Sequence, residues 1–80
     1  MSPLRLEKLA PDKNQFRFYR LDLQPTLFGE WSVVREWGRI GRQGRVVIES
    51  YEHIKEAQQA ITRTVHAKNR RGYKITTPYK

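Results

Sequence analysis

Apolar and polar residues alternate along much of the first fifty positions, which is the period of a β-strand. Residues 4–9 (LRLEKL) predict a first strand that ends before Ala10-Pro11. Asp12-Lys13-Asn14 then supplies residues typical of a turn. Residues 15–24 (QFRFYRLDLQ) resume the alternation and predict a second strand.

The phase of the second predicted strand shifts near Tyr19. One side carries Phe16 and Phe18, whereas the other carries Arg17, Tyr19, Leu21 and Leu23. Large apolar residues therefore occur on both sides. The pattern indicates either a β-bulge or a strand covered on both faces, and it does not separate these alternatives.

Two further strands follow, separated by glycines. Residues 30–37 (EWSVVREW) place Trp31, Val33, Arg35 and Trp37 on one face. Gly38 and the segment 41–44 predict a flexible hairpin turn, and residues 45–51 (RVVIESY) are rich in the β-branched residues that favour strands. Short connections between consecutive strands predict an antiparallel meander.

After residue 51 the period changes to that of a helix. The expected apolar stripe consists of Ile54, Ala57, Ile61, Thr64, Val65 and Lys68. Ser50 is the expected N-cap, with Glu52 in the first turn, and Gly72 is the expected residue just past the C-terminus. A helix of about twenty residues results, and the tail 72–79 is expected to add a short last strand.

These elements predict an α+β fold, an antiparallel meander of four to five strands with one long amphipathic helix on one face. The 80 residues are expected to form a single domain, 1–80, with its core at about 4–76. Apolar residues make up 38% of the sequence, which is ample for a folded protein.

Charge gives the first indication of function. Sixteen Lys and Arg residues against eight Asp and Glu residues give a net charge of +8, which suits a polyanionic partner. No acid lies between Trp37 and Ile48, and none follows Glu56. A second basic cluster comprises Arg63, Lys68, Arg70, Arg71 and Lys74. If the helix end lies near the turn at 39–45, the two clusters are expected to form one groove for a phosphate backbone.

Other site classes lack support in the sequence. No cysteine is present, His53 and His66 are thirteen residues apart, and no nucleophile, acid–base pair or nucleotide-binding glycine loop stands out. We therefore expect no enzyme activity, no metal and no cofactor. We see no signal peptide or membrane span, and we expect a cytoplasmic protein, nucleoid-associated if prokaryotic.

Residues 37–44 read Trp-Gly-Arg-Ile-Gly-Arg-Gln-Gly. The segment Trp37-Gly38-Arg39-Ile40-Gly41 resembles the signature of the WGR domain, which is known from poly(ADP-ribose) polymerases and from short bacterial proteins. Upstream, Tyr19-Arg20-Leu21 resembles the family's Y-x-L segment. Downstream, a helix with an early Ala57 and a basic end before Gly72-Tyr73 is similar to the family's closing pattern. The resemblance covers roughly residues 15–75.

The resemblance implies that this region meets DNA ends, with Trp37 packing on the terminal nucleotide. In the polymerases the motif arginine relays DNA binding to neighbouring domains. Since we expect one domain here, Arg39 is expected to contact phosphate or to fix the turn through carbonyl hydrogen bonds. An alternative for Trp37 is a place in the core, although Trp31 is the expected core tryptophan.

The residue types themselves agree with this interpretation. An indole can stack on a sugar or base, a glycine lets a ligand approach closely, and arginine suits phosphate oxygens. The expected nucleic-acid contacts are Trp37, Gly38, Arg39, Arg42, Arg45, Lys68, Arg70, Arg71 and Tyr73.

The expected function is a non-enzymatic DNA-binding module that contacts the backbone and duplex ends or nicks with limited sequence specificity. RNA is an alternative ligand. A second alternative is an adaptor that docks an acidic protein through its basic face. That alternative requires an exposed apolar patch, for which the candidates are Tyr51, Tyr73 and Tyr79.

Overall fold

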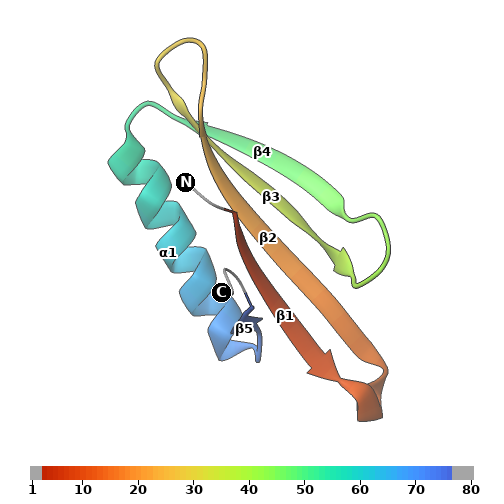
Figure 1. Cartoon of the computed structure of the whole chain (residues 1–80). Helices are drawn as coiled ribbons and strands as arrows, with labels where there is room; N and C mark the ends of the chain where they lie inside the picture. Colours follow the sequence, from red (N-terminus) through yellow and green to blue (C-terminus); the bar gives the residue numbers. More distant parts are fainter. Residues whose placement is uncertain (1–2, 77–80) are drawn as a thin grey trace.

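The computed structural model describes residues 3–76 as one five-stranded antiparallel sheet with a helix on one face (Figure 1). The strand order is β4-β3-β2-β1-β5, so four strands form the predicted meander and the fifth returns to β1. The elements are β1 (Leu4–Ala10), the 3-10 turn η1 (Pro11–Lys13), β2 (Gln15–Pro25), β3 (Trp31–Arg39), β4 (Arg45–Tyr51), α1 (Ile54–Arg70) and β5 (Lys74–Ile75). The predicted α+β class is confirmed. Tyr79, a candidate for an exposed apolar patch, lies outside the described residues.

The register settles the two alternatives for the second strand. Pairing of β2 runs without interruption from Gln15 to Leu21 against β1 and from Arg17 to Pro25 against β3, so there is no bulge. Both faces of the strand are covered instead. Phe18 is only 5% exposed on the face away from the helix, where the guanidinium of Arg5 lies 4.6 Å from its ring centroid.

The helix face, the side of the sheet that α1 covers, carries the core. Partners in antiparallel pairs share a face, so the register places Leu6, Tyr19, Leu21, Leu23 and Val33 together there. These side chains are buried, as are Ala57 of the helix and Tyr73 beyond it. We call the opposite side of the sheet the open face.

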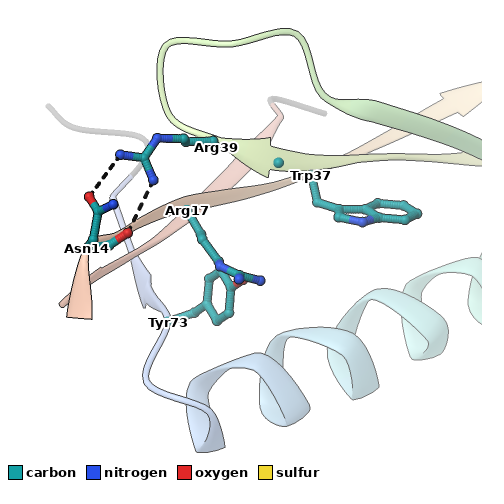
Figure 2. A pocket seen from close by; sticks show the side chains of 6 residues that line it. Asn14, Arg17, Trp37, Arg39 and Tyr73 are labelled. Atoms are coloured by element: carbon teal, nitrogen blue, oxygen red, sulfur yellow. Dashed lines mark hydrogen bonds between the residues drawn. The ribbon is translucent and has the colours of Figure 1, made fainter.

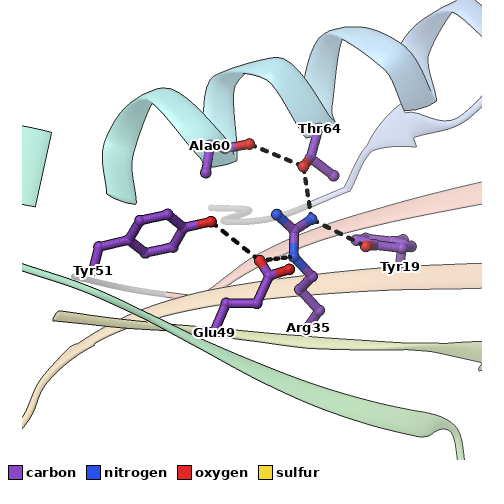
Figure 3. A network of polar contacts seen from close by, with 6 residues as sticks. All are labelled: Tyr19, Arg35, Glu49, Tyr51, Ala60 and Thr64. Carbon is purple, nitrogen blue, oxygen red and sulfur yellow. Dashed lines mark hydrogen bonds and ion pairs between the residues drawn. The ribbon is translucent and has the colours of Figure 1, made fainter. Parts of the chain in front are cut away.

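Arg35 joins the sheet to the helix through a polar network (Figure 3). Its guanidinium donates to Glu49 on β4 at 2.8 Å, to the Tyr19 hydroxyl on β2 at 3.2 Å and to the Thr64 hydroxyl on α1 at 2.7 Å. Thr64 in turn donates to the carbonyl of Ala60. Burial lowers the pKa of Arg35, whereas the hydrogen bonds to Tyr19 and Glu49 and the charges of these two groups raise it. The raising effects together outweigh burial, so the pKa of Arg35 lies above its ordinary value.

The third strand is longer than predicted, and the prediction that Gly38 belongs to the turn is wrong. Gly38 lies inside β3 opposite Phe18, and its φ is not positive. Its lack of a side chain matters for space. A Cβ there would lie 3.1 Å from the Cα of Gly44, and a Cβ on Gly44 would lie 2.6 Å from the Trp37 carbonyl oxygen. The two glycines therefore allow close backbone contact beside the Phe18 ring.

The helix begins later than predicted. Ser50 and Glu52 are not its cap and first turn, because β4 continues to Tyr51 and the helix starts at Ile54. His53 occupies the N-cap without a side-chain hydrogen bond, and Glu56 is the acid of the first turn. Of residues 3–76, no helix has the length and apolar character needed to cross a membrane.

The helix C-terminus matches the prediction. Gly72 has φ +97°, a left-handed conformation that glycine adopts without steric cost. The Gly72 N–H donates to the carbonyl of Asn69, and the Tyr73 N–H donates to that of Lys68, which is a Schellman motif. The chain then reverses so that β5 pairs with β1 through Leu6 and Glu7, confirming the expected short last strand.

Candidate nucleic-acid interface

Three cations lie side by side in one cross-strand row at the end of the sheet. Lys8 on β1 pairs with Arg17 on β2, which pairs with Arg39 on β3. Partners in these pairs share a face, and this row lies on the helix face. Like charges directly opposite each other repel and destabilise a sheet, and an anion bound beside them would offset this repulsion. The row is a natural place for an anion.

A row of aromatic side chains follows immediately. Tyr19 pairs with Trp37 across β2 and β3, and their rings stack with centroids 5.6 Å apart and planes inclined by 12°. Both contribute to the core or pack against it, and Trp37 is half-buried. The stack fixes the indole beside the cation row. Trp31 packs against the core, as expected, and Trp37 does so too, so the core alternative holds in part for Trp37.

The end of the helix brings a second group of residues to the same place. The Schellman motif turns the chain so that Tyr73 packs into the core while Lys68 and Arg71 stay beside it. The Nζ of Lys68 lies 4.6 Å from the Tyr19 ring centroid and 5.4 Å from that of Tyr73. An ammonium over ring faces is attracted by their negative quadrupoles.

Two cavities of about 290 and 270 Å³ open between these groups, and they share Arg17, Trp37 and Tyr73. Figure 2 shows Arg17 and Tyr73 projecting into the first of them, with Trp37 farther along β3 towards the helix. Together we call these cavities the basic recess. Its lining residues are Lys8, Asn14, Gln15, Arg17, Trp37, Gly38, Arg39, Lys68, Arg71 and Tyr73.

Arg39 has a defined structural partner. Its guanidinium donates to the backbone carbonyl and to the side-chain oxygen of Asn14, both at 3.2 Å (Figure 2). It also lies 5.3 Å from the Phe16 ring centroid. Asn14 has φ 53°, so it holds the left-handed position of the β1–β2 turn. Arg39 thus fixes a turn, although that turn is at Asn14 and not within 41–44. Its side chain remains exposed at the rim of the recess.

Neighbouring positive charges act on Lys68 in the recess. Desolvation lowers the pKa of Lys68, and the positive charges of Arg71, Arg17 and Arg35 lower it further. Each of these effects disfavours the charged ammonium. An anion in the recess would oppose the repulsion among these cations.

The structure gathers most of the predicted contacts but not all. Trp37, Gly38, Arg39, Lys68, Arg71 and Tyr73 line the recess. Arg42, Arg45 and Arg70 are exposed but do not line it. Arg45 is nevertheless paired with Trp37 across β3 and β4, so it flanks the aromatic row. Of the two basic clusters that were expected to form one groove, the recess brings together only Arg39 with Lys68 and Arg71.

Sequence reasoning missed four lining residues, Lys8, Asn14, Gln15 and Arg17. A signal was present for one of them. The alternation of β2 places Arg17 on the same face as Tyr19, and the turn at 12–14 pairs it with β1. The exact register, which sets Lys8 opposite Arg17, depends on the conformation of that turn.

Among residues 3–76, no cluster of three or more His, Asp or Glu side chains is placed to hold a metal ion. The lining combines cations, aromatic rings and amides, which suits binding of an anionic, stackable ligand.

Comparison with known proteins agrees with this chemistry. The WGR domain model matches residues 2–79. The chain is also 32% identical over 71 residues to the uncharacterized protein y4dW of Sinorhizobium fredii, and the match covers 89% of this chain and 35% of that protein. The chain therefore spans about a third of the length of that relative. No solved structure gives a significant match. WGR domains are non-catalytic modules with a general association with nucleic acid, and this chain belongs to the WGR domain family.

Proposed function

We propose that this chain is a DNA-binding module that contacts the phosphate backbone and the open ends of a duplex. The observation that carries the proposal is the adjacency of two cross-strand rows, the cations Lys8, Arg17 and Arg39 and the stacked rings of Tyr19 and Trp37. Cations alone suit any polyanion. Cations beside a fixed aromatic stack suit a phosphate chain that carries flat bases.

Phosphates supply most of the affinity in this proposal. Lysine and arginine at the recess neutralise backbone charges and release counterions, so binding weakens as salt increases. About six such contacts give a slope near −5 in a plot of log affinity against log salt. Contacts to the phosphate backbone carry no sequence information, so sequence specificity is limited in this proposal.

Trp37 supplies the preference for ends. An open duplex end exposes the face of its last base pair and a terminal sugar, whereas the interior of a duplex exposes neither. Stacking on an aromatic side chain is worth about 1–3 kcal/mol per base. Because Tyr19 backs the indole at 5.6 Å, Trp37 is held in place before the ligand arrives.

A pair of charge-matched variants tests the cation part of this proposal. Arg71→Ala removes a cation of the recess, and Lys55→Ala removes one near the other end of the helix. Each variant lowers the net charge by one. We expect Arg71→Ala to weaken binding to a blunt duplex clearly more than Lys55→Ala, as measured by fluorescence anisotropy. Equal losses would show that only net charge matters.

A pair of tryptophan variants tests the stacking part. Trp31 and Trp37 lie on the same strand and face and both pack against the core, so their truncation costs stability in both cases. We expect Trp37→Ala to abolish the preference for open over hairpin-closed duplex, while folded Trp31→Ala keeps it. Circular dichroism at the assay temperature establishes that both are folded. Loss of the preference in both variants would contradict the role of Trp37.

A further inference from the structure

The two edges of the sheet differ in how they are protected. One edge is formed by β5, which has only two residues and includes Lys74. Short edge strands and lysine are devices that prevent pairing with another chain. The other edge is β4, with seven residues, no lysine and no proline. Within residues 3–76, β4 pairs only with β3, on the side of the sheet away from β1 (Figure 1).

The surface of β4 is apolar and balanced in charge. Val46 and Ile48 are 53% and 63% exposed on the open face, beside Val34 of β3. The strand contains one basic residue, Arg45, and one acidic residue, Glu49, in a protein whose net charge is +8. Two copies of β4 therefore approach each other without a net charge repulsion between the strands.

The strand is complementary to itself. If two copies of β4 pair antiparallel about Val47, Arg45 of each copy lies opposite Glu49 of the other, and Val46 lies opposite Ile48. Each pair then joins opposite charges or two apolar side chains. A register centred on Ile48 would instead oppose Val47 to Glu49. The Glu49 side chain is 43% exposed, so a guanidinium from outside can approach its carboxylate while Arg35 holds it from within.

We propose that the chain forms a homodimer in which two β4 strands pair antiparallel about Val47 and the two sheets become one. The two-fold axis of such a pairing is perpendicular to the sheet, so both helices cover the same face. Trp37 pairs with Arg45 at the beginning of β4. The two basic recesses therefore lie towards opposite ends of the paired strands. Their joint use on DNA rests on the proposed function, whereas the pairing itself does not.

Sedimentation equilibrium of the wild-type chain without nucleic acid tests the pairing. We expect a reversible equilibrium between the 9.6 kDa monomer and a species of twice that mass. The omission of nucleic acid keeps this test independent of the DNA-binding proposal. A chain that stays monomeric up to millimolar concentration would overturn the dimer.

Two double variants test the register. Both variants carry Val46→Lys, and residue 46 lies opposite Glu36 of its own chain. They differ only at residue 48, where Ile48 is replaced by Lys in one variant and by Glu in the other. In the proposed register, Val46→Lys/Ile48→Lys opposes like charges and is expected to be monomeric. Val46→Lys/Ile48→Glu opposes unlike charges and is expected to dimerise. Thermal unfolding of each variant establishes that it is folded. Equal dimerisation of the two variants, or the reverse order, would overturn the proposal.

Discussion

Replacement of Arg35 by alanine is the most informative test of how the helix is held on the sheet. Arg35 is the common donor to Glu49, Tyr19 and Thr64, which belong to β4, β2 and α1 (Figure 3). Its side chain is 15% exposed, so water replaces these bonds only in part. The helix also packs on the core through Ala57, Ile61 and Val65.

The expected loss follows from these contacts. A hydrogen bond with a charged partner contributes about 1.5–3 kcal/mol when buried. The Glu49 carboxylate is 43% exposed, so its ion pair contributes at most about 1 kcal/mol. Thr64 can still donate to Ala60, and its hydroxyl is not left without a partner. We estimate a loss of roughly 2–4 kcal/mol for Arg35→Ala, in a domain whose total stability is expected to be about 4–12 kcal/mol.

Urea unfolding followed by circular dichroism measures this loss. A double-mutant cycle of Arg35→Ala, Thr64→Ala and the double variant isolates the hydrogen bond between Arg35 and Thr64. We expect a coupling free energy of about 1–2 kcal/mol for this bond. Glu49→Ala serves as the comparison and is expected to cost about 1 kcal/mol or less. An Arg35→Ala variant within about 0.5 kcal/mol of wild type, the range of ordinary surface substitutions, would refute the reasoning.

Packing and charge lead to three further predictions. Gly44→Ala should lower the thermal stability more than Gly38→Ala. A Cβ on residue 44 would lie 2.6 Å from a strand carbonyl oxygen, whereas a Cβ on residue 38 would lie 3.1 Å from its nearest neighbour. The opposite order of stabilities would contradict this difference in backbone contact. Leu27→Ser/Phe28→Ser should leave the free energy of unfolding within about 0.5 kcal/mol of wild type, because these side chains are 99% and 88% exposed; a larger loss would indicate that they contact another part of the chain. The pKa of Lys68, measured by nitrogen-15 NMR of Nζ, should lie below 10.5. The unfolded chain binds more protons between the folded pKa and 10.5, so the Lys68 contribution to stability should rise with pH in that window; a measured pKa at or above 10.5 would contradict this.

The strand pattern was predictable because each strand has a covered face. The alternation of 4–9, 15–24, 30–37 and 45–51 located all four long strands to within two residues at each end. The pattern of strand 15–24 was ambiguous because Phe18 is buried on the open face. Arg5 lies over its ring and two glycines lie beside it, and alternation alone does not reveal such cover. The helix start was misplaced because Ser50 and Glu52 carry capping residue types, yet β4 pairs with β3 as far as Tyr51.

The candidate site was predictable only where its residues are close in sequence or follow the family motif. Trp37, Lys68 and Tyr73 were named from a strand end and a helix end, and the fold brings them to one recess. Lys8 and Arg17 were missed because their adjacency arises from strand register. The role of Arg39 at the Asn14 turn depends on a contact across 25 positions, which local patterns do not encode.

Competition between two duplexes of identical sequence, one with open blunt ends and one with both ends closed by hairpin loops, tests the central claim most directly. The cation row binds either duplex through its backbone, whereas Trp37 has a base pair to stack on only at an open end. The account predicts that the open duplex binds about tenfold tighter, as one stacked base would provide, and that both affinities fall steeply with salt. Equal affinity for the two duplexes would contradict recognition of ends, and the absence of salt-dependent binding to either would contradict the basic recess as a DNA site.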